Sequence, residues 1–356
     1  MKVRGAIVAL TLGVLGVLAL GGCTTADYLR QSVVGHLDIL RRTRSVTDWL
    51  AEPNLDGALR ERLELARRVR NWAVAELGLP DNASYRRYAE LDRPAAVWNV
   101  VAAPELSLTL KTWCFPVLGC VGYRGYYARE EAEALAASLR AEGLEASVYG
   151  VPAYSTLGWL EWLGGDPLLS TFIGWPDGEL ARLIFHELAH QVAYASDDTV
   201  FNESFATAVE RLGGRRWLAE QASPAARAEY EAFDARRRAF QALTRRTREA
   251  LAAIYANPAL DDGAKRRAKA AQMAAMRAEH VRLKFGPWNG FAGYDRWFAG
   301  ANNATLAVQG AYDDLVPAFE RLFEREGRDF ARFYAAVRRL AALPKAERLA
   351  TLRTSI

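Results

Sequence analysis

Two of the chain's four histidines lie close together in the pattern His-Glu-x-x-His, at positions 186–190. Because successive helix residues turn by about 100°, His186 and His190 would emerge one turn apart on the same face. Two imidazoles at this spacing can bind a single Zn²⁺, and Glu187 beside them could take a proton from an activated water. The pattern therefore predicts the metal-assisted hydrolysis of a polar bond.

A catalytic zinc also needs a third protein ligand and a position open to water. Glu203 follows His190 by thirteen residues, in a helical pattern over 199–212 that Asp198 could cap. Apolar neighbours indicate that this helix is buried, and a buried carboxylate requires a metal or another partner. We expect Glu203 to be the third ligand; the alternative is a solvated glutamate in the first turn of its helix.

These residues resemble the gluzincin metallopeptidases, in which the His-Glu-x-x-His helix is followed by a helix that carries Asn-Glu. More closely, the chain is similar to a predicted zinc aminopeptidase family of bacterial lipoproteins. The resemblance rests on segments 183–191, 201–206, 111–127, 150–159 and 294–307. It implies one Zn²⁺ per chain, a peptide substrate and aminopeptidase activity.

One position departs from the gluzincin pattern. The residue four after the metal-binding glutamate, often Asp, is Thr207 here. The group that orients a zinc-bound histidine must then come from elsewhere, and we consider Asp197, Asp198 or a backbone carbonyl.

Other residues could bind the substrate or stabilise the transition state. Tyr312 could donate a hydrogen bond to the oxyanion. Glu161 and Asp166, in a stretch rich in aromatic residues and glycine, could hold a substrate's α-amino group. Tyr123 could lie on an edge strand that pairs with extended substrate, as the gluzincin resemblance implies. The alternatives are a core-filling loop and a structural aromatic strand.

The elements that position these residues predict an α+β, mainly helical fold like that of gluzincins, with a single metallopeptidase domain over 23–356. We expect strands at Val97–Val101, Leu106–Trp113, Gly119–Tyr123 and Glu145–Tyr149, with a helix at Ala128–Glu142. The expected segments are N-terminal helices 26–79, a small sheet 96–150, zinc-site helices 177–213, a helical hairpin 225–285 and cleft-closing helices 294–356.

The first 22 residues have the features of a lipoprotein signal peptide. Lys2 and Arg4 precede an apolar stretch that ends in Leu20-Gly21-Gly22-Cys23, which resembles a bacterial lipobox. We expect Cys23 to be lipid-modified after cleavage, which would anchor the chain in the outer membrane of a Gram-negative bacterium, facing the periplasm. A transmembrane anchor is the alternative.

Charge and cysteine content narrow the partners and the compartment. The 46 basic and 42 acidic residues are nearly balanced, so we expect no nucleic-acid partner. Cys114 and Cys120 flank a turn, and in an oxidising compartment a disulfide is the simplest interpretation. The alternative is a pair of thiolate zinc ligands.

Three functions remain compatible with this sequence. The first is a zinc peptidase, with Glu187 as general base. The second is an envelope lipoprotein whose zinc site is structural or vestigial and which acts by binding a partner. The third is a zinc amidase that acts on a cell-wall crosslink. Whether a peptidase would cut at chain ends or internally stays open.

Overall fold

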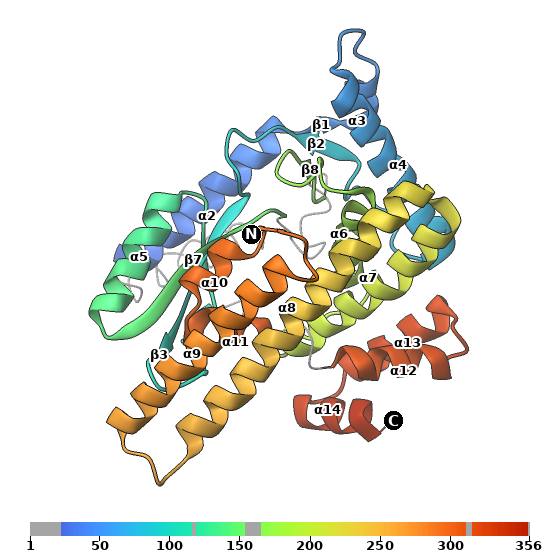
Figure 1. Ribbon diagram of the computed structural model, residues 1–356. Coiled ribbons are helices and arrows are strands. Elements are labelled where there is room, and N and C mark those ends of the chain that lie inside the picture. The colour runs from blue at the N-terminus through green and yellow to red at the C-terminus, as the bar shows by residue number, and fades with distance from the viewer. Residues whose placement is uncertain (1–22, 116–118, 154–164, 311–314, 355–356) are drawn as a thin grey trace, which may run out of the picture.

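The computed structural model describes residues 23–115, 119–153, 165–310 and 315–354 (Figure 1). The fold is α+β and mainly helical, with small sheets set among the helices. The predicted signal peptide, Glu161 and Tyr312 lie outside the described residues.

The N-terminal region, where helices were expected over 26–79, is helical and divided into three helices. It forms α2 (Cys23–Arg42), α3 (Val46–Leu50) and α4 (Gly57–Leu77). The divisions follow from local capping: the Ser45 side chain accepts from the Asp48 amide, and Asp56 accepts from the Leu59 amide. The strand β1 (Arg44–Ser45) pairs with β2 (Arg87–Ala89), which pairs in parallel with β8 (Leu168–Leu169). The sequence analysis did not predict this sheet.

A second sheet has the strand order β6–β3–β7, and both of its pairings are antiparallel. Its strands are β6 (Arg124–Tyr126), β3 (Val97–Pro104) and β7 (Leu144–Val151). The helix α5 (Arg129–Ala141) packs on one face, and α11 (Asn303–Gly310) packs on the other. Strands near 97 and 145 and a helix near 128 were expected from the sequence.

The prediction of a strand at Leu106–Trp113 is wrong, because only Trp113 of these residues belongs to a strand. After β3 the chain turns: the Ser107 amide donates to the carbonyl of Pro104, and the Ser107 hydroxyl accepts from the Thr109 amide. These local bonds compete with strand pairing. Alternating leucines at 108 and 110 instead reach two different apolar clusters. The ribbon that follows pairs β4 (Trp113–Phe115) with β5 (Gly119–Val121), and a disulfide joins Cys114 to Cys120.

Two packed helices form the centre of the fold, α6 (Asp177–His190) and α7 (Thr199–Gln221). We expected the zinc-site helices to end at residue 213, but α7 continues to Gln221. The glycines at 213 and 214 allow close packing inside the helix. A Cβ at Gly213 would lie 2.5 Å from Cδ1 of Leu77 on α4, and one at Gly214 would lie 3.0 Å from Cγ of Arg182 on α6. Close approach therefore explains these glycines better than helix termination.

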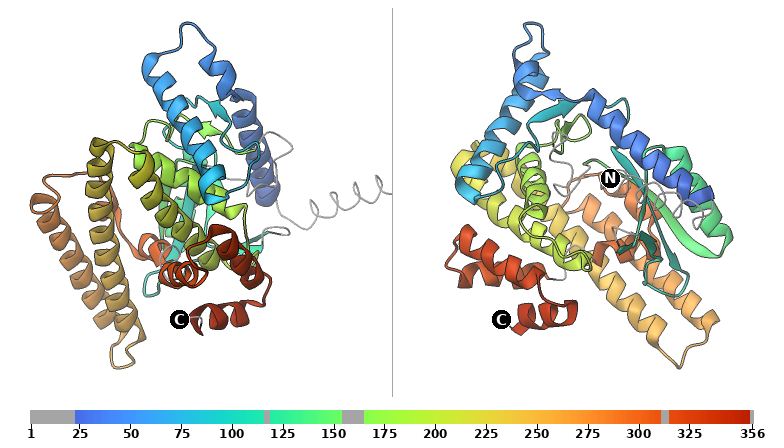
Figure 2. Two further views of the ribbon diagram at one scale, coloured as in Figure 1. Left: turned by 90° about the vertical axis from the view of Figure 1, so that its right-hand side faces the viewer. Right: turned by 180° about the vertical axis from the view of Figure 1, so that it is seen from behind.

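A long helical hairpin, α8 (Pro224–Ala256) and α9 (Asp262–Phe285), runs along one side of the molecule (Figure 1). It coincides with the hairpin expected at 225–285. The remaining helices are α10 (Asp295–Gly300), α12 (Val316–Arg325), α13 (Phe330–Ala341) and α14 (Lys345–Thr354). Figure 2 shows α12 to α14 gathered at the C-terminal end of the chain, where α12 packs on α7. Within the ranges described above, no helix combines the length and apolarity needed to span a bilayer.

Candidate metal centre

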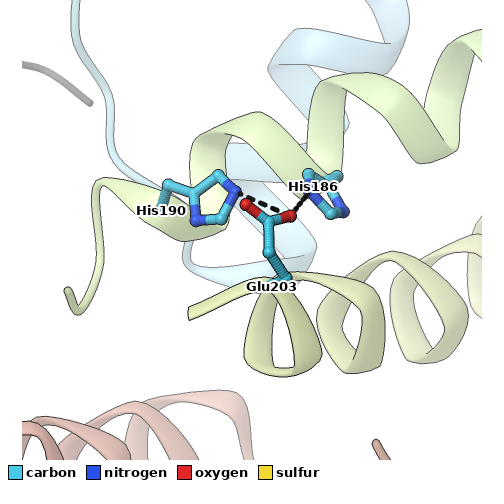
Figure 3. Close-up of side chains that lie close together, drawn as sticks. All are labelled: His186, His190 and Glu203. Carbon is cyan, nitrogen blue, oxygen red and sulfur yellow. Dashed lines mark ion pairs between the residues drawn. The ribbon is translucent and has the colours of Figure 1, made fainter. Parts of the chain in front are cut away.

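Three side chains from α6 and α7 converge on one point (Figure 3). The Oε2 atom of Glu203 lies 3.3 Å from Nε2 of His186 and 3.8 Å from Nε2 of His190. One ligand atom from each residue lies within 4.8 Å of the other two. The predicted triad is therefore brought together, with both histidines on α6 and the glutamate on α7.

The connection between the two helices fixes this convergence. Asp198 caps α7 by accepting a hydrogen bond from the Phe201 amide at 3.2 Å. Asn202 reaches back to Ala195, where its Oδ1 accepts from the amide at 2.8 Å and its Nδ2 donates to the carbonyl at 2.7 Å. Asn202 is 2% exposed and directly precedes Glu203. The Asn-Glu pair thus combines a buried residue that holds the chain reversal with a candidate metal ligand.

His186 has a second carboxylate partner, Glu210. The Nδ1 atom of His186 lies 3.0 Å from Oε2 of Glu210, which also forms an ion pair with Arg182 on α6. Arg182 in turn lies 3.8 Å from Asp234 of α8. A chain of alternating charges therefore leads from the metal centre to the helical hairpin.

This arrangement corrects the sequence analysis, which looked for the orienting group at Asp197, Asp198 or a carbonyl. Both aspartates instead bind Arg348 of α14, at 2.9 and 3.0 Å. Glu210 lies seven residues after Glu203, so both project from the same face of α7. That spacing was a signal in the sequence, but a glutamate at this offset is too common to be selected without the fold.

The charges around the site differ for the two histidines. Burial alone would lower the pKa of His186, but its hydrogen bonds to Glu203 and Glu210 raise it well above the usual value. For His190, burial prevails over the attraction of Glu203 and lowers the pKa to about 4. Burial would raise the pKa of Glu210, yet Arg182 and His186 lower it to about 2. His190 is therefore neutral near pH 7, which is the form that binds a metal.

The donor set fits a catalytic zinc ion. Two imidazole nitrogens and one carboxylate oxygen match the ligand types of such sites and leave one tetrahedral position for water. Because Nδ1 of His186 bonds to Glu210, its Nε2 is directed toward Glu203. The Nδ1 atom of His190 is buried and has no hydrogen-bond partner among the described residues.

Glu187 lies on α6 between the two histidines and is half-buried. A phenol lies near it. The pKa of Tyr85 is raised well above the usual value, first by complete burial and then by the carboxylates of Glu187 and Asp166. The Tyr85 hydroxyl has no hydrogen-bond partner in the described part of the chain, and its backbone has a φ of 62°. A left-handed tyrosine with an unpaired buried hydroxyl is unusual for a structural residue.

Asp166 is held against the end of the metal helix. Gln191, the residue after His190, donates from Nε2 to Oδ2 of Asp166 at 3.4 Å. The Asp166 backbone is also fixed, because its carbonyl accepts from the Tyr85 amide at 2.6 Å and its amide donates to the Ser84 hydroxyl at 3.1 Å. Of the two acids proposed to bind an α-amine, Asp166 therefore lies against the C-terminal end of α6, where it is 1% exposed.

The charge of Glu203 acts on three more tyrosines. Burial raises the pKa of Tyr123, Tyr149 and Tyr194, and the negative charge of Glu203 raises each further. Tyr123 precedes β6 and is 43% exposed. The sequence analysis named only Tyr123 of these three. Tyr149 lies on a strand far from α7 in sequence, so only the fold brings it near Glu203.

Comparisons with known proteins agree with this chemistry at a coarse level. A family model described as "Putative aminopeptidase" matches residues 27–352, which is nearly the whole chain. Neither the curated proteins nor the solved structures contain a significant match.

Proposed function

Because the chain belongs to the putative aminopeptidase family, we propose that it is a zinc-dependent peptidase in which His186, His190 and Glu203 hold the metal. The observation that carries the proposal is the convergence of those three ligand atoms within 4.8 Å. A structural zinc site is usually closed by four protein ligands and has no use for an adjacent base. Three ligands with Glu187 beside them favour catalysis.

The chain's own residues supply proton transfer and orientation. Zinc bound at this site would supply a water with a pKa lowered toward ~7 and an electrophile for the substrate carbonyl. Glu187 accepts a proton from the attacking water on its carboxylate and delivers it to the departing amine. Glu210 holds the His186 ring through Nδ1. Tyr123, a partly exposed phenol near Glu203, can donate to the developing oxyanion.

Aminopeptidase action requires a site for the substrate's α-ammonium group, and Asp166 is our candidate. Its carboxylate lies against Gln191, one residue beyond His190. A carboxylate at that position would hold the substrate's free N-terminus, so that the bond to be cut is the one after the first residue. Substituting Asp166→Asn keeps the size of the side chain and removes the charge. We expect the substitution to reduce cleavage after the first residue in peptides with a free N-terminus more than in matched peptides with an acetylated N-terminus.

A mixed peptide pool provides the test of the reaction class. Purified protein lacking residues 1–23 is incubated with the pool, with and without a chelator, and the cut positions are read by mass spectrometry. We expect chelator-sensitive release of N-terminal residues and restoration by Zn²⁺. Absence of cleavage by metal-loaded protein would overturn the peptidase assignment, and internal cuts alone would overturn the aminopeptidase assignment.

We also propose that Cys23 carries the lipid anchor and that the protein faces the periplasm from the outer membrane. The proposal is supported by the Leu20-Gly21-Gly22-Cys23 pattern after an apolar stretch. Labelling with a palmitate analogue should mark the native chain and not the Cys23→Ala variant. Equal labelling of the two would refute the anchor.

A further inference from the structure

A concave surface lies between β7, at the edge of the β6–β3–β7 sheet, and the helices α5, α10 and α11. This groove has a volume of about 860 Å³. No member of the metal triad lines it. One wall consists of residues from segment 294–307, which carried part of the resemblance but has no role in the metal chemistry above. The residues used below are Trp98, Val148, Gly150, Arg296 and Trp297.

The opposite wall is an unpaired strand edge. The strand β7 is the outermost strand of its sheet, because the order is β6–β3–β7. On the β6 side of β3, the carbonyl of Ala102 accepts from the Lys111 amide. Antiparallel residues alternate, so its partner Ala146 directs its backbone groups away from β3. The carbonyl of Ala146 indeed accepts hydrogen bonds from Arg140 of α5 at 3.0 and 3.2 Å.

The same alternation directs the backbone N–H and C=O groups of Val148 and Gly150 outward, into the groove. Both residues line it, and Gly150 is exposed. Unlike Ala146, neither has a hydrogen bond on this side to any described residue. An open strand edge with free donors and acceptors is a template for another extended chain.

The groove lining holds two cations, Arg140 and Arg296, and one acid, Glu133, which lies 3.8 Å from Arg129. Arg296 on α10 is exposed, and in the ranges that the structure covers it forms neither an ion pair nor a hydrogen bond. Arg140, the other cation of the lining, is already bound to Ala146. The indoles of Trp98 and Trp297 add apolar surface on either side. Backbone groups, flanking aromatics and one unpaired guanidinium together match an acidic or free-carboxyl peptide in extended form.

We propose that this groove binds an extended peptide segment, which adds to the edge of β7 at Val148 and Gly150 and places a carboxylate at Arg296. The site goes beyond the proposed function, because it requires neither the metal nor the general base. Tyr149, between the two pairing residues, packs on the cluster of Val101, Ala103 and Ala304, on the face of the sheet that α11 covers. An added strand would therefore bind beside a residue that also lies near the metal centre.

Hydrogen exchange of the backbone amides tests strand addition directly. The probe is an acetylated heptapeptide of alternating valine and threonine with a free C-terminal carboxylate, added to Glu187→Gln protein to prevent turnover. We expect slower exchange in residues 144–151. Two analogues carry N-methyl groups on alternate residues, the odd-numbered residues in one and the even-numbered residues in the other. The analogue whose free amides face β7 should keep the protection, and the other analogue should lose it. No protection with any of the three peptides, or equal effects of both analogues, would refute strand addition.

Matched substitutions test the two contact types. Val148→Pro removes the outward N–H, which an edge strand tolerates, and Val148→Thr is its control. We expect Val148→Pro to weaken binding about tenfold and Val148→Thr to leave it unchanged. Arg296→Gln should weaken binding of the free-carboxyl peptide about tenfold but leave its C-terminal amide unaffected. Arg339→Gln, an exposed arginine of α13, serves as the control.

Thermal unfolding of each variant identifies any loss of fold. If Val148→Pro does not fold, the Arg296 variant and the N-methylated peptides still decide the question. Equal weakening of the carboxylate and the amide by Arg296→Gln would overturn the role of the guanidinium. Unchanged binding in a folded Val148→Pro protein would overturn the pairing at β7.

Discussion

The Oε2 atom of Glu210 lies 3.0 Å from Nδ1 of His186, on the side of the imidazole opposite Glu203. A single helix, α7, thus supplies both a candidate metal ligand and the group that would orient another candidate ligand. Arg182 balances the charge of Glu210, and its side chain is 6% exposed. The orientation of His186 therefore depends on a buried ion pair that contains no metal ligand.

Substituting Glu210→Gln should weaken metal binding about 10- to 100-fold, because the amide holds the imidazole less firmly than a carboxylate does. It should also lower the free energy of unfolding of the metal-free protein by about 3 kcal/mol, since Arg182 stays buried without its counter-charge. Zinc titration and urea unfolding measure the two effects. The double variant Arg182→Met/Glu210→Gln should regain stability without regaining affinity. Unchanged zinc affinity in Glu210→Gln would contradict the orienting role.

Two isosteric glutamate substitutions should separate metal binding from catalysis. Glu203→Gln removes a charged ligand, so we expect loss of bound zinc and of activity together. Glu187→Gln should retain zinc and lose about 100-fold or more in kcat, because the amide cannot accept the water's proton. Metal content by mass spectrometry and peptide turnover are measured on the same samples. Full activity in Glu187→Gln, or full zinc content in Glu203→Gln, would reverse the assigned roles.

Tyr85→Phe should separate activity from stability. The Tyr85 hydroxyl is buried and unpaired among the described residues, so its removal should leave the free energy of unfolding unchanged or slightly raised. If the phenol contacts the substrate beside Glu187, kcat/KM should fall about tenfold or more. A variant that loses stability but keeps its kcat/KM would show that Tyr85 has only a structural role.

Arg348 of α14 binds Asp197 and Asp198 at the start of α7, and we call this contact the Arg348 clamp. It should make the free energy of unfolding depend on pH in the acid range. Burial would raise the pKa of Asp197, but its hydrogen bond and ion pair with Arg348 lower it below 3.8. Since the pKa is lower in the folded state, this stabilisation is present above pH 3.8 and is lost as pH falls through the folded value. Arg348→Gln should therefore destabilise the chain near neutral pH and show a smaller further loss in acid.

Urea unfolding of both proteins across this pH range measures the difference. Arg348 is 3% exposed and also pairs with buried Asp198, so we expect a cost of about 3 kcal/mol near neutral pH. Arg339→Gln, at an exposed arginine of α13, is the control. A parallel pH dependence in Arg348→Gln and the native protein would contradict the clamp.

Local patterns in the sequence were enough to predict the metal triad and the longest helices. The spacing of His186 and His190 lies within one helix turn, and α8 and α9 begin where Ser223 and Asp261 cap them. Such features depend on neighbours a few residues apart. They are therefore visible without the fold.

Two errors and one missed residue involve contacts between distant segments. The zinc-site helices were expected to end at residue 213, but the glycines at 213 and 214 lie inside α7 and pack against Leu77 and Arg182. Leu108 and Leu110 alternate as in a strand, yet they fill two separate clusters. Glu210 could not be distinguished from other surface glutamates until α6 was placed beside α7.

The contact between Arg348 and Asp198 joins positions 150 residues apart and has a consequence for biogenesis. Synthesis from the N-terminus completes the three candidate metal-binding side chains well before Arg348, which secures the segment between α6 and α7. The candidate metal site should therefore reach its final geometry late, when the last helices dock.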